Sequence, residues 1–179
     1  MKILLVKTSS LGDVVHALPA VTEASNLVEN VSFVWVVEES LSAIPGLHPA
    51  VSQVIPVAVR RWRKSWWGAR DEIRRFSDQV KALDIDLVLD SQGLIKSALL
   101  ARMAGRSIAG FNSVSAREGM ASWFYQQVHN VPQNQHAVLR QKELFAGALG
   151  YRANESIDYG LHGRFERQSG KIMLMHGTT

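Results

Sequence analysis

The chain begins MKILLVKTSSLGDVVHALPA (residues 1–20), where a short apolar run gives way to a small polar loop and then to a helical pattern. Residues 2–6 predict a buried strand. After the loop at residues 8–13, apolar residues recur at helical spacing, namely Val14, Val15, Leu18, Val21, Leu27 and Val28. The stretch therefore predicts a strand–loop–helix unit, with one carboxylate, Asp13, at the point where the strand passes into the helix.

Strand and helix patterns alternate along the rest of the chain. Short β-branched or apolar runs predict strands at residues 31–37, 51–57, 85–90 and 107–111. A charged segment that ends at about residue 83 predicts a helix, as do residues 94–103, 115–128 and 135–149. Gly150 is placed to end the last of these helices in a left-handed conformation. This alternation predicts an α/β fold, with a parallel sheet covered by helices on both faces.

Length and composition favour a soluble, cytoplasmic protein with one sizeable core. The 179 residues are 46% apolar, and the formal net charge is +4. Lys7 interrupts the first apolar run too early for a signal peptide, and no later run approaches the roughly 18 residues that cross a bilayer. Without cysteine, and with scattered histidines, the chain offers no disulfide framework and no metal-ligand spacing.

The loop before the first helix has two interpretations. Ser9, Ser10 and Gly12 are small enough to let a ligand approach the backbone, whose N–H groups could hold an anion or a sugar hydroxyl. Alternatively, Ser10 caps the helix and Asp13 only offsets the helix dipole, for about 0.3–1 kcal/mol. Because Gly12 is the only glycine, the loop matches neither a dinucleotide fingerprint nor a phosphate loop, which argues against nicotinamide and nucleoside-triphosphate enzymes.

A basic segment interleaved with tryptophan forms the second candidate site. It contains Arg60, Arg61, Arg63 and Lys64 together with Trp62, Trp66 and Trp67. Arginine forks match carboxylates and phosphates, and tryptophan prefers a boundary that is half apolar, so the segment suits an anionic amphiphile at a membrane surface. Alternatively, the segment could be a solvated helix face with tryptophan in the core, or it could bind single-stranded nucleic acid.

Six separated motifs, in order over residues 2–151, carry a family resemblance. They are KTSSLGDVVHALPA, WVVEE, IPVAVRRWRK, DSQGLIKSAL, AREGMASWFY and the pair QHAV and ELFAGALGY. Together they resemble the lipopolysaccharide heptosyltransferase I group of glycosyltransferase family 9. The resemblance implies the N-terminal, Rossmann-like domain of a GT-B glycosyltransferase, with acceptor binding in residues 1–160. Residues 161–179 would then be a connector and the first strand, at residues 171–176, of a truncated donor-binding domain.

The resemblance also implies an activity: transfer of L-glycero-D-manno-heptose from ADP-heptose to the inner Kdo of Kdo2-lipid A, with inversion. Asp13 matches the general base of the family. The implied acceptor-binding residues are Ser9, Ser10, Gly12, Arg60, Arg61, Arg63, Lys64, Gln92 and Arg117. Thr178 and Thr179, in the closing HGTT, match the start of the donor site. The resemblance implies no metal, and we expect no cofactor.

The same comparison predicts a monomer attached peripherally to the inner face of the cytoplasmic membrane, and no nucleic-acid partner. Since most donor-binding residues of the family would follow Thr179, we expect this chain to be inactive alone. Two alternatives remain open: a related transferase with another acceptor, and a non-enzymatic module that binds anionic lipid or nucleic acid through the basic segment. His136 and Arg140, one helical turn apart, could meet a phosphate or pair locally.

Overall fold

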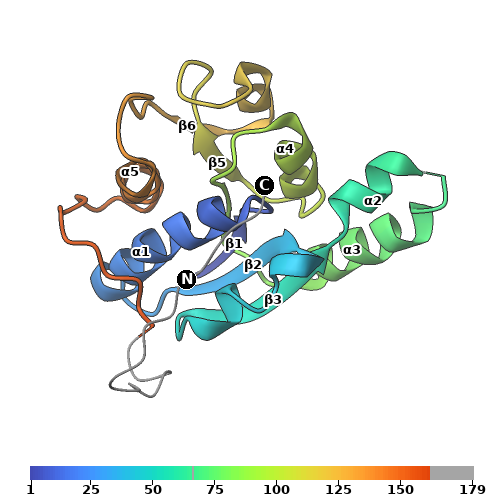
Figure 1. The fold of residues 1–179 in the computed structure, drawn as a ribbon, viewed down its shortest axis with the longest axis horizontal. Helices are drawn as coiled ribbons and strands as arrows, with labels where there is room; N and C mark the ends of the chain where they lie inside the picture. Colours follow the sequence, from blue (N-terminus) through green and yellow to red (C-terminus); the bar gives the residue numbers. More distant parts are fainter. Residues whose placement is uncertain (66, 162–179) are drawn as a thin grey trace, which may run out of the picture.

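The computed structural model describes residues 1–65 and 67–161, which form a parallel sheet with helices on both faces (Figure 1). Its six strands follow the order β3-β2-β1-β4-β5-β6, and each neighbouring pair is parallel. The strands are β1 (Lys2–Val6), β2 (Ser32–Glu38), β3 (Val51–Val57), β4 (Leu87–Asp90), β5 (Ile108–Phe111) and β6 (Gln127–His129). This is the strand order of Rossmann folds, so the predicted fold class is confirmed.

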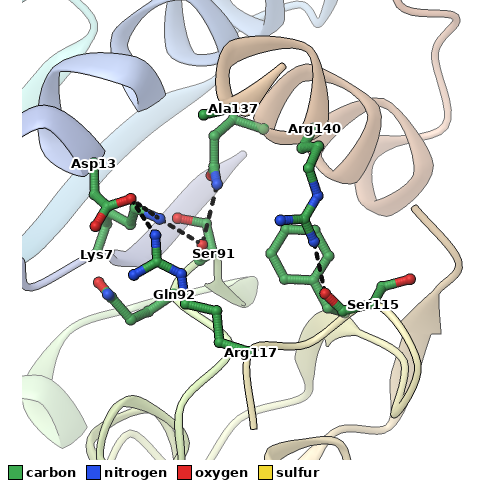
Figure 2. Close-up of a pocket in the computed structure, with 10 residues that line it drawn as sticks. Lys7, Asp13, Ser91, Gln92, Ser115, Arg117, Ala137 and Arg140 are labelled. Carbon is green, nitrogen blue, oxygen red and sulfur yellow. Dashed lines mark hydrogen bonds and ion pairs between the residues drawn. The ribbon is translucent and has the colours of Figure 1, made fainter. Parts of the chain in front are cut away.

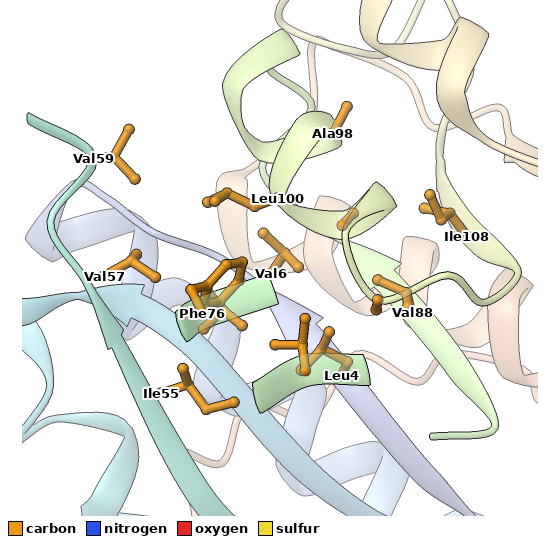
Figure 3. Close-up of a cluster of buried hydrophobic side chains, with 14 of the residues drawn as sticks. Leu4, Val6, Ile55, Val57, Val59, Phe76, Val88, Ala98, Leu100 and Ile108 are labelled. Carbon is orange, nitrogen blue, oxygen red and sulfur yellow. The ribbon is translucent and has the colours of Figure 1, made fainter. Parts of the chain in front are cut away.

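The helices divide between the two faces of the sheet because alternate residues of each strand point to opposite sides. Ile3 and Leu5 of β1 pack with the helices α1 (Leu11–Leu27) and α5 (Ala137–Leu149), which lie side by side. Leu4 and Val6 face the other core, drawn in Figure 3. That core is covered by α2 (Val59–Lys64), α3 (Arg70–Ala82) and α4 (Ile95–Arg102).

Short 3-10 turns complete the connections. They are η1 (Glu39–Leu41), η2 (Pro45–Leu47) and η3 (Gly119–Phe124), the last of which packs on α4. Gly150 has a φ of 75° and ends α5 in the left-handed region, as predicted. Among the described residues, no helix combines the length and the apolarity needed to cross a membrane.

The predicted helix at residues 115–128 is wrong. The segment contains η3 and then turns into β6, whose residues Gln127, Val128 and His129 pair with β5. The backbone packs closely at Gly119, where a Cβ would lie 2.8 Å from the carbonyl oxygen of Ser113. Pairing with the exposed edge of β5 outweighs the helical periodicity of this stretch, and local pattern does not reveal such pairing.

The C-terminal part of the chain is described only up to residue 161. Residues 151–161 contain neither helix nor strand. The predicted strand at residues 171–176 lies outside the described residues, as do Thr178 and Thr179. The division into residues 1–160 and 161–179 therefore stays a prediction.

Candidate active site

A small pocket lies at the carboxyl ends of β1, β4 and β5 (Figure 2). The chain order of the strands reverses between β1 and β4, and ligands of open α/β sheets bind in the crevice at such a switch point. The residues that line it are Lys7, Asp13, Ser91, Gln92, Phe111, Ser115, Arg117, Ala137, Arg140 and Gln141. They come from four separate parts of the chain, which the sheet brings to one edge.

Asp13 stands in the first turn of α1, on the wall of this pocket. Its Oδ2 accepts hydrogen bonds from the Ser10 N–H at 3.0 Å and the Ser10 hydroxyl at 3.2 Å. Its Oδ1 accepts from Arg117 Nη2 at 2.6 Å and lies 4.0 Å from Lys7 Nζ. Burial opposes ionisation, but Lys7, the Ser10 N–H and Arg117 outweigh it and hold the pKa of Asp13 below its usual value. The carboxylate is therefore ionised at neutral pH.

Asp13 combines the two roles considered for its loop, since it belongs both to the helix cap and to the pocket. Ser10 occupies the N-cap position, and its N–H donates to Asp13 in one half of a capping box. The other oxygen of the same carboxylate faces the cations of the pocket. The capping hydrogen bonds fix the position of Asp13 through Oδ2, while Oδ1 faces the pocket.

Lys7 forms the floor of the pocket at the end of β1. Its side chain is 2% exposed, and Nζ donates to the Ser91 carbonyl at 2.9 Å. Burial lowers the pKa of Lys7 to about 8, against the opposing effect of the Asp13 carboxylate. A cation held at this depth strengthens the positive potential of the pocket.

Lys7 predicts a pH effect on stability. The unfolded pKa is about 10.4, so between pH 8 and that value the unfolded chain binds more protons than the folded chain, and stability rises with pH. We expect the free energy of unfolding to increase over this window by about 1–3 kcal/mol more in the wild type than in Lys7→Met. Urea unfolding at about pH 7, 9 and 10.5 measures it. Parallel pH curves for the two proteins would contradict the assignment.

Gln92 joins the two loops at the switch point. Its Nε2 donates to the Ser9 carbonyl at 2.6 Å, and its Oε1 accepts from the Thr8 and Ser9 N–H groups at 3.1 and 3.3 Å. The side chain is thus held by the backbone of the β1–α1 loop, whose conformation places Asp13. The contacts of Gln92 are those of a positioning residue, although it also lines the pocket.

Asp90, fully buried at the end of β4, organises the next loop. It accepts hydrogen bonds from the N–H groups of Gln92 and Gly93 and from the hydroxyls of Ser97 and Tyr125, at 2.7–3.3 Å. Burial raises the pKa of Asp90, while these hydrogen bonds act in the opposite direction. Gly93 has a φ of 69° and lies against the backbone of Arg117, so the loop at residues 91–93 has little freedom to move.

Metal ligands do not cluster in the part of the chain that the structure describes, where no group of three His, Cys, Asp or Glu side chains is placed to hold an ion. The chemistry available at the pocket comes from one carboxylate, three cations and several amide and hydroxyl groups.

A family model for glycosyltransferase family 9 (heptosyltransferase) matches residues 73–173, more than half of the chain. The chain belongs to glycosyltransferase family 9.

Curated relatives in this family are similar over most of the chain. Lipopolysaccharide heptosyltransferase 1 of Pseudomonas aeruginosa is 49% identical over 187 aligned residues, which cover 100% of this chain and 53% of that protein. Lipopolysaccharide heptosyltransferase 1 of Escherichia coli K12 is 49% identical over 154 residues, covering 84% of this chain and 48% of that protein. This family 9 chain therefore spans about half the length of the curated relatives that it matches.

Solved structures agree with the fold. The E. coli heptosyltransferase WaaC with ADP-2-deoxy-2-fluoro heptose superimposes with a TM-score of 0.87 at 46% identity, covering 90% of this chain and 52% of that one. E. coli ADP-heptose lps heptosyltransferase II superimposes with a TM-score of 0.64 at 18% identity, which speaks for the fold alone. The predicted GT-B fold class and family are thereby confirmed.

The structure brings some of the predicted site residues together and separates others. Asp13, Gln92 and Arg117 line one pocket, although Gln92 and Arg117 lie far from Asp13 in the sequence. Ser9, Ser10 and Gly12 belong to the loop that carries Asp13 but are not among the residues lining the pocket.

The basic segment lies elsewhere on the same edge of the sheet. Arg60, Arg61, Arg63 and Lys64 are exposed on α2, which follows β3, two strands away from β1. Figure 1 shows α2 at the side of the molecule away from α5. The Arg61 guanidinium is bonded to Glu39 at 2.7 Å and Glu72 at 2.9 Å, so part of this positive charge is neutralised.

The two described tryptophans of that segment differ: one lies in the core and the other at the surface. Trp62 is buried in the core and donates to Glu72 at 2.7 Å. Trp67 is 65% exposed, with the Arg70 guanidinium 5.2 Å from its ring centre. Trp66 lies outside the described residues. A core role is therefore correct for Trp62, whereas Trp67 lies at the surface.

Several pocket residues could not be identified from the sequence. Lys7 was considered only as the residue that interrupts the first apolar run, and a charged residue directly after a buried strand and beside a ligand-binding loop was the available signal. Arg140 was noticed only as a neighbour of His136. Ser91 lies in the DSQG motif, of which only Gln92 was predicted as a site residue. Ser115 and Gln141 carried no signal, because only the packing of α5 and the β5 loop against β4 brings them to the pocket.

Proposed function

We propose that this family 9 chain is the acceptor-binding half of an inverting heptosyltransferase of the lipopolysaccharide inner core. The reaction is transfer of L-glycero-D-manno-heptose from ADP-heptose to the inner Kdo of Kdo2-lipid A. Two kinds of finding support it: relatives at 49% identity are named lipopolysaccharide heptosyltransferase 1, and similar WaaC structures hold ADP or ADP-2-deoxy-2-fluoro heptose. The observation that carries the proposal is the ionised Asp13 carboxylate on the wall of a switch-point pocket.

Asp13 acts as the general base. The acceptor hydroxyl gives its proton to Asp13 while its oxygen bonds to the anomeric carbon, and ADP leaves from the opposite face of the sugar with the bonding electron pair. The configuration at that carbon inverts. Because Lys7 and Arg117 lower the pKa of Asp13, its strength as a base is modest, and its contribution comes mainly from position.

The acceptor extends from the pocket toward the basic segment. Gln92 and Arg117 would contact the reacting sugar in the pocket, and Ser9, Ser10 and Gly12 would contribute through the loop that carries Asp13. The four cations of α2, Arg60, Arg61, Arg63 and Lys64, would meet the more distant anionic groups of the acceptor. Exposed Trp67 next to these cations suits peripheral attachment at the inner face of the cytoplasmic membrane, where each basic residue contributes about 1 kcal/mol. We propose that the protein works there as a monomer.

ADP-heptose binds mainly to the second domain of the GT-B arrangement, with Thr178 and Thr179 at its beginning. The chain spans about half of its relatives, so we propose that these 179 residues do not turn over by themselves. Donor binding is the step that they would lack.

An assay of ADP release tests the proposal. We expect ADP to be released from ADP-heptose and Kdo2-lipid A by a protein that also carries the donor-binding domain, and no release by the 179-residue chain alone. Turnover by this chain alone would contradict the proposal that donor binding requires the second domain. Turnover only with another sugar acceptor would favour a related transferase, and retention of single-stranded DNA with a steep salt dependence would favour a nucleic-acid module.

A further inference from the structure

Exposed apolar side chains gather on η3 and on the helix against which it packs. Trp123 is 77% and Met120 52% exposed on η3, and Leu99 is 46% exposed on α4. The two elements are in contact, and the Ile95 N–H at the start of α4 donates to the Glu118 carboxylate, directly before η3, at 2.7 Å. We call Leu99, Met120 and Trp123 the η3 patch. Large apolar groups that share a surface mark an interaction site.

The geometry of η3 explains why two large side chains are presented together. In a 3-10 turn, residues three apart lie on the same side, so Met120 and Trp123 project in one direction. The other side of η3 faces the protein, where Ala121 is buried and Phe124 packs against the core shared with α4. The turn therefore has a core side and an apolar outer side.

Positive charge flanks the η3 patch on α4. Lys96 and Arg102 stand three residues before and after Leu99, on one side of the helix. Among the described residues, no carboxylate is ion-paired with either of them. Arg106, just beyond the helix, lies 3.9 Å from Asp84, but this pair is exposed and its attraction is screened by water.

Acidic residues are scarce in this part of the chain. Glu118 is the one acidic residue in the sequence between positions 91 and 134, and its carboxylate already accepts the Ile95 N–H. The η3 patch thus joins tryptophan, methionine and leucine to basic neighbours. Tryptophan prefers a boundary that is half apolar and half wet, and basic residues are attracted to anionic headgroups. This composition is typical of a surface that enters the headgroup region of an anionic bilayer.

Other occupants fit the same observations less well. A second copy seated on the η3 patch by two-fold symmetry would bring Lys96 and Arg102 against their own equivalents, and like charges repel. A further domain that completes the pocket would cover the carboxyl ends of the strands. The η3 patch instead lies on the face of the sheet that α2, α3 and α4 cover (Figure 1).

We propose that the η3 patch is a membrane-docking surface, in which Trp123 and Met120 enter an anionic lipid bilayer and Lys96 and Arg102 meet its headgroups. The inference rests on the proposed function, which places the protein at a membrane, and it assigns insertion to η3 and not to α2 alone. Arg117 lines the pocket shortly before Met120 in the chain. An acceptor carried by the same bilayer would therefore reach the pocket close to the point of attachment.

Co-sedimentation of the 179-residue chain with lipid vesicles tests the surface. One vesicle is pure phosphatidylcholine, and the other also contains an equal amount of phosphatidylglycerol. We expect binding to the mixed vesicles and at least about 10-fold weaker binding to the neutral ones. Met120→Ser with Trp123→Ser should weaken binding to the mixed vesicles at least about 10-fold. Lys96→Gln with Arg102→Gln should weaken it at least about 5-fold and reduce its dependence on salt.

Two substitutions elsewhere serve as matched controls. Leu27→Ser removes a side chain that is 51% exposed at the end of α1, on the opposite face of the sheet. Arg152→Gln removes an exposed cation after α5. Both should bind vesicles like the wild type. Circular dichroism confirms that each variant is folded.

Tryptophan fluorescence gives a second readout that locates the insertion. Lipids brominated in their acyl chains quench a tryptophan that enters the bilayer. Trp123→Phe keeps an apolar ring, so it should bind the mixed vesicles like the wild type and show clearly less quenching. Quenching equal to that of the wild type would place Trp123 outside the bilayer and overturn the proposal.

Three further results would overturn the membrane-docking surface: no binding to the mixed vesicles, equal binding to both kinds of vesicle, or wild-type binding by the folded Met120→Ser, Trp123→Ser protein. A dimer in sedimentation velocity that this variant abolishes would assign the η3 patch to a second copy instead. Failure of the proposed function has a different signature, because these vesicles contain no Kdo2-lipid A. ADP release by the protein with both domains would then be absent, even though vesicle binding through the η3 patch persists.

Discussion

Asp13→Asn is expected to lower the rate of heptosyl transfer by about 10²–10⁴-fold, measured as ADP release in the protein with both domains. The amide oxygen can still accept the hydrogen bond from the Ser10 N–H, so the start of α1 is preserved. The amide cannot take a proton from the acceptor hydroxyl, and it no longer attracts Lys7 and Arg117. The loss should therefore fall on the chemical step more than on folding.

A second helix supplies the matched control for Asp13. Asp71 is an exposed acidic residue in the first turn of α3, where it interacts with the helix dipole away from the pocket. Asp71→Asn should cost about 0.3–1 kcal/mol of stability and leave the rate of transfer unchanged. If Asp13→Asn retains the wild-type rate and changes stability by a similar amount, Asp13 is a helix cap and the general-base assignment is wrong.

Asp90→Ala is expected to lower the free energy of unfolding by about 3–5 kcal/mol. The substitution leaves two loop N–H groups and the hydroxyls of Ser97 and Tyr125 without their acceptor in a fully buried environment. It also frees the loop at residues 91–93, whose Gln92 holds the loop that places Asp13. Urea unfolding at neutral pH measures the change.

Tyr125→Phe serves as the control for Asp90, because it removes one of the four hydrogen bonds and keeps the ring that packs on Gly110. We expect it to cost about 1–1.5 kcal/mol. A loss below about 1 kcal/mol in Asp90→Ala would mean that the freed donors find other partners. In that case Asp90 would not organise the switch-point loop.

Local pattern was enough to predict most of the secondary structure. The apolar run at residues 2–6 and the helical spacing after it predicted β1 and α1, and Gly150 marked the end of α5. The same approach failed at residues 115–128, where β6 exists because β5 offers it a free edge. Hydrogen bonds between strands connect residues distant in sequence, and periodicity within one window carries no information about them.

For the candidate site too, the sequence predicts the local feature but not the contacts between distant residues. Asp13 could be predicted as a carboxylate at a strand-to-helix junction, since that position depends on residues 2–28 alone. Its partners could not be derived from spacing: Arg117 is 104 residues away, and the Ser91 carbonyl that holds Lys7 is 84 residues from it.

The sequence by itself determined an α/β chain with an acidic residue after its first strand, because strand and helix periods and small loop residues are local properties. Only the tertiary structure decided that Lys7, Arg117 and Arg140 meet around that residue while the cations of α2 lie two strands away. The physical reason is that the order of strands in the sheet, set by pairing and by burial on both faces, determines which loops share an edge.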